Sequence, residues 1–473
     1  MSSASSPSHN QAAIGPDGLV RALGIIESGS LVVGTVIGTG IFLVASDMMK
    51  AVHSLGWILL VWVVGGFLSL CGALGYAELG ALRPAAGGEY VFLRDGYGGR
   101  TGGLLSFLYG WSMFWIIRPT SVATIATAFV RAAEFIWPQL ALEPRWLPVH
   151  LAWGKLLAVA LIWVVAAINY VGVLYGGRVL ALFTVLKLLL VAGLTVAAFS
   201  FGVGHWNHLQ QRLPGPVTLG GFAAAMMAAL WAYDGWNDIT LAGSEIRAPE
   251  RNIPRAIVGG LFVIFVIYAV VNLAYIFVLH PAAIAAAPNV ASAMAQRLIG
   301  RGGGGVVAAA IMISVFATLN SSILTGARAP FALARDPELF PNRAARALGR
   351  AHERFHTPHV SLLVLAGFGT FYALLGNFES LYTWTLFSAW LFYALTIGAL
   401  FGFRRRGERS PYQSWGYPVL PGIFILLAGA LLAVTFVEHL QASFVGLAVI
   451  LAGVPIYFRW TRPGNQGSGA GGR

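Results

Sequence analysis

Charged side chains are scarce in this sequence. Of its 473 residues, only 10% are Asp, Glu, Lys or Arg, whereas 57% are hydrophobic. Because about a quarter of the residues in soluble globular proteins are charged, an ordinary soluble domain is excluded. A chain that crosses the bilayer many times must satisfy its backbone hydrogen bonds within each span. The composition therefore predicts an all-α integral membrane protein.

Cysteine is nearly absent from the sequence, which also shows no signal peptide and no catalytic motif. Cys71 is the only cysteine, which excludes a disulfide within the chain, and residues 1–28 lack the charged start and cleavage site of a signal peptide. There is no Walker loop, nucleophile elbow, or haem or flavin motif. The histidines fall in loops without carboxylates at ligand spacing. We therefore expect no enzyme activity, no cofactor and no metal.

Apolar runs dominate what is present, and twelve of them are long enough to cross about 30 Å of hydrocarbon as helices. Their approximate bounds are 29–49, 56–80, 104–130, 151–173, 179–203, 219–243, 256–280, 305–330, 359–376, 381–403, 418–437 and 440–459. We number these expected spans 1 to 12. The glycine-rich tail over 460–473 is expected to be disordered.

The basic residues indicate the orientation of the spans. With both termini inside, 21 of the 30 Lys and Arg residues fall in cytoplasmic segments, seven in the opposite segments and two within spans. This asymmetry follows the positive-inside rule. It predicts a multi-pass protein of the cell membrane, plasma or bacterial inner, with the segment 1–28 and the C-terminal tail in the cytoplasm. The net charge of +12 does not gather on a soluble domain, so no nucleic-acid partner is expected.

Span 1 contains a sequence that weakens a helix. The stretch from Gly34 to Phe42 reads Gly-Thr-Val-Ile-Gly-Thr-Gly-Ile-Phe, and each helical glycine costs roughly 1 kcal/mol relative to alanine. Broken backbone at membrane depth is tolerated where it faces protein or a wet cavity, and its freed N–H groups can then bind an anion. From this stretch alone, a small-residue face for helix packing is an equal alternative.

Span 6 is interrupted by polar residues. The stretch from Trp231 to Asp238 places Asp234, Asn237, Asp238 and a glycine inside an apolar segment, whereas Trp236 is interpreted as core packing. An intramembrane ionisable residue is a functional-site hypothesis by default. Interrupted segments at corresponding places in two halves point to the binding site of a transporter. We therefore predict an inverted-repeat transport core and two additional helices, with these bounds: core 29–403, first repeat 29–203, second repeat 219–403, additional helices 418–459.

Three further charged residues lie in or near spans. Arg118 lies roughly halfway across span 3 and costs on the order of 3 kcal/mol to insert, which favours a structural role, satisfying carbonyls freed at the kink of Pro119, over contact with a substrate. Lys187 lies ~12 Å inside span 5, where snorkelling to the surface and replacement of a bound cation are equal alternatives. Glu78, at the end of span 2, is expected to pair with a nearby arginine.

Four stretches together resemble the L-type amino acid transporter family of the amino acid-polyamine-organocation superfamily: Gly34–Phe42, Ile116–Pro119, Trp231–Asn237 and Arg354–Pro358. The resemblance covers roughly residues 20 to 460. It implies the five-plus-five inverted-repeat (LeuT-like) fold with 12 transmembrane helices, of which helices 1 and 6 are broken and two are additional. It also implies exchange of amino acids that is usually independent of sodium.

The resemblance assigns roles to the residues of span 1. The amide groups around Gly38, Thr39 and Gly40 would bind the α-carboxylate of the substrate, which agrees with the preference of a helix N-terminus for an anion. The backbone carbonyls near Val36 would accept from the α-ammonium.

Spans 5 and 6 receive roles by the same resemblance. Carbonyls of Trp231 and Asp234 would also accept from the α-ammonium, the indole of Trp231 would cover the substrate, and Asn237 would line the pocket. Lys187 would occupy the place that a sodium ion takes in related folds, which argues against sodium coupling.

Two departures from the family pattern affect the expected partners and substrates. Residues 131–150 contain no cysteine, so a disulfide-linked glycoprotein partner is not expected. Asp234 replaces the glycine of several transporters of large neutral amino acids and resembles members that also accept cationic ones. Its carboxylate either pairs with a substrate cation or bonds to the broken backbone, and these alternatives are equal.

The expected function is sodium-independent exchange of neutral and, through Asp234, cationic L-amino acids by alternating access. A proton-coupled amino acid symporter, in which Lys187 titrates, is the alternative. A non-transporting amino acid sensor is a third possibility, and no appended cytoplasmic domain favours it.

Overall fold

All regular structure in the described part of the chain is helical. The computed structural model describes residues 21, 23–85, 87–140, 153–171, 176–334, 347–350, 352, 357–438 and 440–460. Within this part, only two isolated β-bridges occur, Leu23 with Ile246 and Ser54 with Arg212. The expected tail lies, apart from Trp460, outside the described residues.

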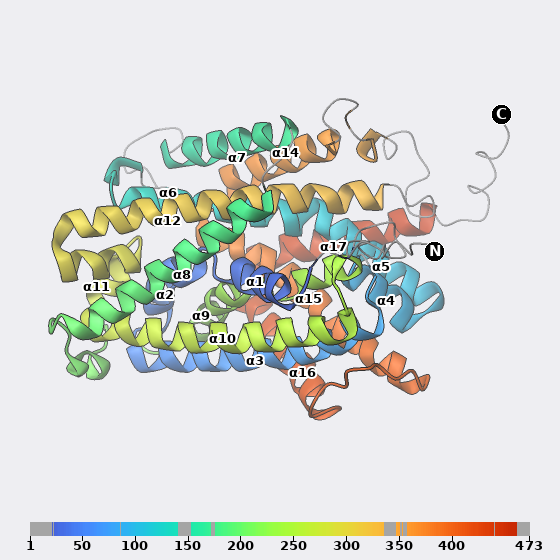
Figure 1. Cartoon of the computed structure of the whole chain (residues 1–473), viewed down its shortest axis with the longest axis horizontal. Helices are drawn as coiled ribbons and strands as arrows, with labels where there is room; N and C mark the ends of the chain where they lie inside the picture. Colours follow the sequence, from blue (N-terminus) through green and yellow to red (C-terminus); the bar gives the residue numbers. More distant parts are fainter. Residues whose placement is uncertain are drawn as a thin grey trace, which may run out of the picture.

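The long helices form one elongated bundle and run roughly along its length (Figure 1). In chain order the elements are α1 (Ile25–Val36), α2 (Gly40–Val52), α3 (Leu55–Leu82), α4 (Glu89–Tyr97), α5 (Gly99–Ser112), the π-helix η1 (Met113–Ile117), α6 (Arg118–Glu134), η2 (Pro138–Leu140), α7 (Trp153–Val171), α8 (Gly176–Ser200), η3 (Trp206–Gln210), α9 (Leu219–Tyr233), η4 (Asp238–Glu245), α10 (Pro249–Val278), α11 (Pro281–Ala286), α12 (Val290–Leu333), α14 (His359–Leu375), α15 (Phe378–Arg405), α16 (Val419–Glu438) and α17 (Leu440–Trp460). Because α4 and α11 lie at opposite ends in Figure 1, we name the two ends of the bundle the α4 end and the α11 end.

Most expected spans appear as long apolar helices. Among the described residues, nine helical segments are long and apolar enough to cross a membrane, and they match expected spans 1 to 4, 7, 8 and 10 to 12. Two shorter apolar helices, Val185–Ser200 and His359–Leu375, match expected spans 5 and 9. Helix α9 covers only the first part of expected span 6. The prediction of an all-helical membrane protein is confirmed.

Both predicted interruptions are present. Helix α1 ends at Val36 and α2 begins at Gly40. Helix α9 ends at Tyr233, because Asp234 has an extended backbone and Gly235 has a φ of +106°. A left-handed φ of this kind favours glycine. The apolar run over 219–243 is therefore two short helices separated by a turn.

Two other spans depart from a simple helix. In span 3, the π-helix η1 precedes Pro119, which lies in the first turn of α6. Because the helix runs without a break over 99–134, this proline removes an internal donor, and the carbonyl of Trp115, four residues earlier, accepts from the Tyr372 hydroxyl at 3.0 Å instead. Helix α12 bends at Gly300, which has a φ of +82°, and expected span 8 begins after this bend.

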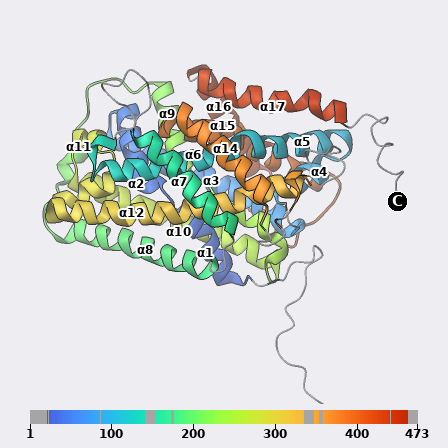
Figure 2. The same ribbon diagram turned by 90° about the horizontal axis from the view of Figure 1, so that it is seen from above.

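Packing encloses the broken spans. Helices α3 and α10 lie side by side, α6 packs on α12 and α14, and α2 packs on α9. In Figure 1, α1, α2, α9 and α15 lie between the α3–α10 pair and the group formed by α6, α7, α12 and α14. Figure 2 shows α16 and α17 along one edge of the bundle and α8 along the opposite edge. The helix breaks are thus held inside a frame of continuous helices.

Candidate functional site

The two helix breaks are in direct contact. A Cβ atom on Gly40 would lie 2.5 Å from the Cα of Ala232, and one on Gly235 would lie 2.7 Å from Cγ2 of Thr35. Real Cβ atoms do not approach this closely. Gly40 requires glycine because its nearest neighbour is backbone, and Gly235 requires it because of its φ of +106°. The packing interpretation of the span 1 glycines is therefore correct for Gly40, and the contact it makes holds the two breaks together.

The break in span 1 leaves backbone donors at the start of α2 uncommitted. The Gly38 N–H donates to the Val36 carbonyl at 2.7 Å. In the part of the chain that the structure describes, no hydrogen bond engages the N–H of Thr39 or Gly40. These two groups lie at the start of the 13-residue helix α2, where the helix dipole and free N–H groups favour an anion. Of the three amides expected to bind a carboxylate, Gly38 already has an acceptor.

A tyrosine that the sequence analysis missed joins the two breaks. The hydroxyl of Tyr268, a fully buried residue of α10, lies 3.0 Å from the Val36 carbonyl oxygen and 2.8 Å from that of Ala232. Its single proton reaches one of these carbonyls at a time. The Val36 carbonyl, which was predicted to accept from a substrate ammonium, thus already has two donors within the protein, the Gly38 N–H and the Tyr268 hydroxyl.

Lys187 points into the bundle toward span 1. Its side chain is 3% exposed, and Nζ donates to the carbonyls of Gly34 at 3.2 Å and Ile37 at 3.0 Å. These carbonyls belong to the end of α1, where the chain has lost its helical partners. The side chain therefore does not snorkel to the surface, and its ammonium supplies the positive charge next to the break.

Trp231 closes over the break from the last turn of α9. Its ring stacks on Tyr382 of α15 with a centroid distance of 6.4 Å, and its Nε1 donates to Oγ1 of Thr39 at 3.4 Å. The neighbouring Trp236 is fully buried with its ring edge-on to Tyr76, as the packing interpretation predicted.

Asp234 and Asn237 meet at a tyrosine of α15. The hydroxyl of Tyr393 donates to Oδ1 of Asp234 at 3.0 Å and lies 3.4 Å from Oδ1 of Asn237. The Asn237 amide nitrogen donates to Glu89 at 2.5 Å. Asp234 is partly accessible, whereas Asn237 is buried. The amide of Asn237, which was expected to line a pocket, is thus committed to protein partners.

The buried arginine and the helix-end glutamate both form ion pairs. Nη2 of Arg118 lies 3.2 Å from Oδ1 of Asp238. A carboxylate of span 6 therefore balances its charge, whereas we had expected carbonyls at the kink to be its partners. Glu78 pairs with Arg404 at 2.6 Å, as predicted. Within the described residues, no three His, Cys, Asp or Glu side chains gather to hold a metal.

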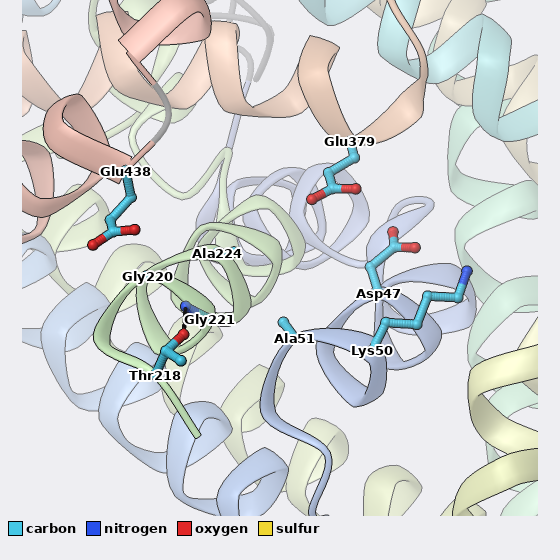
Figure 3. Close-up of a pocket in the computed structure, with 9 residues that line it drawn as sticks. All are labelled: Asp47, Lys50, Ala51, Thr218, Gly220, Gly221, Ala224, Glu379 and Glu438. Atoms are coloured by element: carbon cyan, nitrogen blue, oxygen red, sulfur yellow. Dashed lines mark hydrogen bonds between the residues drawn. The ribbon is translucent and has the colours of Figure 1, made fainter. Parts of the chain in front are cut away.

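A pocket of about 340 Å³ opens at the α11 end. Its charged lining residues come from three helices: Asp47 and Lys50 from α2, Glu379 from α15 and Glu438 from α16 (Figure 3). Each broken span has one half on the side of the α11 end, α2 in span 1 and α9 in span 6. The pocket lies over these two halves.

An ion pair ties α2 to α6 beside this pocket. Nη1 of Arg131 lies 2.8 Å from Oδ2 of Asp47, both side chains are 11% exposed, and Nη2 also donates to Ser46. The guanidinium lies over the ring of Phe378 at the start of α15. Sequence reasoning missed this pair, because the two residues are 84 positions apart.

The apolar helices, together with two interrupted helices whose breaks meet inside the bundle, define a multi-pass membrane transport protein. The amino acid permease family model matches residues 23–457. The chain therefore belongs to the amino acid permease family, and the resemblance inferred from the motifs is confirmed.

Named relatives align over nearly the whole chain. The serine/threonine exchanger SteT of Bacillus subtilis (strain 168) is 29% identical over 448 residues, which are 93% of this chain and 97% of that protein. The human b(0,+)-type amino acid transporter 1 is 29% identical over 450 residues, 93% of this chain and 88% of that protein. The human Asc-type amino acid transporter 1 is 28% identical over 447 residues, 93% of this chain and 82% of that protein.

Proposed function

We propose that this protein is a sodium-independent exchanger of neutral and cationic L-amino acids that works by alternating access. One observation carries the proposal: the breaks of spans 1 and 6 meet inside the bundle and leave the N–H groups of Thr39 and Gly40 uncommitted. Relatives named as amino acid exchangers and transporters support it.

In this proposal the N–H groups of Thr39 and Gly40 bind the substrate carboxylate, with Gly38 allowing close approach. The α-ammonium donates to the carbonyls of Trp231 and Asp234, and to that of Val36, which then gives up one of its two present donors, Gly38 or Tyr268. This assignment is supported by the start of α2, which favours an anion, and by the end of α9, whose last carbonyls favour a cation.

The substrate side chain then lies beside span 6. Trp231 covers it, Asn237 shapes the wall through its own partners, and the Asp234 carboxylate receives the ammonium or guanidinium of a cationic side chain. The partial accessibility of Asp234 supports this role. Charge-assisted pairs of this kind are among the stronger hydrogen bonds.

We further propose a 12-helix arrangement of two inverted five-helix repeats and two additional helices. Spans 1 and 6 are the first helices of the repeats, which agrees with their matching breaks. The α4 end lies in the cytoplasm, because 21 of the 30 Lys and Arg residues then fall on that side. Residues 131–150 lack cysteine, so the protein works without a disulfide-linked partner.

Lys187 takes the place of a coupling cation. Its ammonium contacts two carbonyls of the α1 end, which are oxygen ligands of the kind that a sodium ion would use. The alternative, a proton-coupled symporter in which Lys187 titrates, is supported by the same burial, since a buried ammonium is readily deprotonated.

Uptake into proteoliposomes separates these functions. Labelled alanine and lysine are added outside vesicles that contain either no amino acid or unlabelled alanine, in sodium and in choline medium. Exchange predicts uptake that depends on internal amino acid and is equal in both media. Uptake that ignores internal substrate and follows a pH gradient would favour symport, and no uptake of any amino acid would contradict both.

A further inference from the structure

Glu89 is a buried carboxylate without a cationic partner. It is the first residue of α4, its side chain is fully buried, and it accepts from Nδ2 of Asn237 at 2.5 Å and from the Tyr109 hydroxyl at 3.0 Å. In the described part of the chain, no Lys or Arg forms a salt bridge with it. Burial raises the pKa of Glu89, and the hydrogen bond from Asn237 opposes this rise.

A chain of adjoining polar side chains joins Glu89 to Asp234. Asn237 donates to Glu89 through its amide nitrogen, and its amide oxygen lies 3.4 Å from the Tyr393 hydroxyl. That hydroxyl donates to Asp234 at 3.0 Å, and its single proton reaches either Asp234 or the Asn237 oxygen, one at a time. The carboxylate proposed to contact the substrate is therefore linked through two side chains to a carboxylate at the α4 end.

The charges around this chain do not balance. The carboxylates are Glu89, Asp234 and Asp238, and the only guanidinium beside them among the described residues is Arg118, which pairs with Asp238. The other titratable groups facing Glu89 come from α3, α5 and α15, and they are tyrosines, which are neutral below about pH 10: Tyr76, Tyr109 and Tyr393.

Lys187 does not correct this imbalance directly, since its ammonium is directed at the carbonyls of span 1. Two negative charges thus remain in a largely buried network. An unpaired buried charge is costly, and such a group either binds a proton or acquires a cationic partner.

We propose that the Glu89–Asp234 network carries one proton when a neutral amino acid is bound and releases it when a cationic amino acid binds. The proton resides on a carboxylate oxygen of the network. The cationic side chain beside Asp234 replaces its charge, so the total charge of the occupied site stays constant. This inference rests on the proposed exchange of neutral and cationic amino acids.

The proposal predicts pH dependences of opposite sign. If alanine binds with uptake of one proton, its dissociation constant rises by up to about tenfold per pH unit where the free network is deprotonated. If lysine displaces one proton, its dissociation constant falls by up to about tenfold per pH unit where the free network is protonated. Between about pH 5.5 and 8.5 alanine itself stays neutral and lysine stays cationic.

The test measures binding of labelled alanine and labelled lysine to the purified protein across this pH range. We expect the two affinities to change in opposite directions. In Glu89→Gln, which keeps the shape but removes the charge, the alanine affinity should lose most of its pH dependence. Glu250→Gln is the control, because Glu250 lies in the first turn of α10 and is not among the groups that act on Glu89 or Asp234, and both dependences should persist in it.

A transport measurement on the unaltered protein completes the test. Vesicles loaded with alanine are given external lysine, with a pH-sensitive dye outside. Each lysine that enters should be accompanied by one proton leaving with alanine, so the exchange acidifies the medium and generates no membrane potential. Parallel or flat pH dependences, or lysine-for-alanine exchange that moves charge without protons, would overturn the inference while leaving exchange intact. Absence of alanine-for-alanine exchange would instead contradict the proposed function.

Discussion

Replacing Gly40 by alanine tests the contact between the two breaks. The added methyl would lie 2.5 Å from the Cα and 2.6 Å from the Cβ of Ala232, whereas favourable carbon contacts lie at about 3.5 to 4.0 Å. Because the nearest atom is backbone, α2 and α9 must separate by about 1 Å. Overpacking of this kind costs about 1 to 3 kcal/mol.

The displacement moves the start of α2, so we expect alanine exchange by Gly40→Ala to fall roughly 5- to 150-fold, at about 1.4 kcal/mol per factor of ten. Gly29→Ala is the matched control. Gly29 lies in α1, and a Cβ there meets no atom within 4 Å; alanine should be tolerated and should favour the helix. Exchange and thermal unfolding of both purified variants are measured. If Gly40→Ala exchanges amino acids as fast as Gly29→Ala, the two breaks do not depend on this contact.

Three further substitutions probe the site. Tyr268→Phe removes the hydroxyl shared by both breaks and should cost about 1 to 3 kcal/mol, seen as slower exchange and a lower unfolding temperature; unchanged values would contradict a joining role. Asp47→Asn should weaken an ion pair whose breakage costs about 3 to 5 kcal/mol when buried. We therefore expect a cysteine placed at Ala51 to react with a thiol reagent at least about tenfold faster in Asp47→Asn than in the otherwise unaltered protein. The native Cys71 is buried. Equal labelling rates in the two proteins would show that the ion pair does not hold α2. Asp234→Asn should weaken lysine exchange roughly tenfold to a hundredfold, by the loss of a charged hydrogen bond, and alanine exchange far less; equal losses would indicate a backbone role.

The positions of the breaks could be predicted from local sequence. Gly34 to Phe42 and Trp231 to Asp238 combine glycine with polar residues inside apolar runs, and helix weakening is a local property. The structure interrupts both stretches where the composition changes. The pairing of Glu78 with an arginine was predictable for a similar reason, because a charged residue at the end of a span commonly pairs with a nearby opposite charge.

The partners of the site residues could not be predicted in this way. Asn237 bonds to Glu89, which is 148 positions away, and Tyr268 looks like any aromatic residue of a continuous apolar helix. The commitment of the Gly38 N–H to Val36 depends on the turn that the chain adopts after α1. These features arise from tertiary packing, so a single sequence carries no local signal for them.

The central claim is that the uncommitted N–H groups of Thr39 and Gly40 bind the carboxylate of a transported amino acid. Its most direct test is competition against labelled alanine exchange by unlabelled alanine and by alaninamide, which keeps the ammonium and the methyl group but lacks the carboxylate. We predict that alanine competes fully, and that alaninamide competes at least about a hundredfold more weakly, because hydrogen bonds to a charged group contribute about 1.5 to 3 kcal/mol each. Equal competition by the two compounds would contradict the assignment of this site.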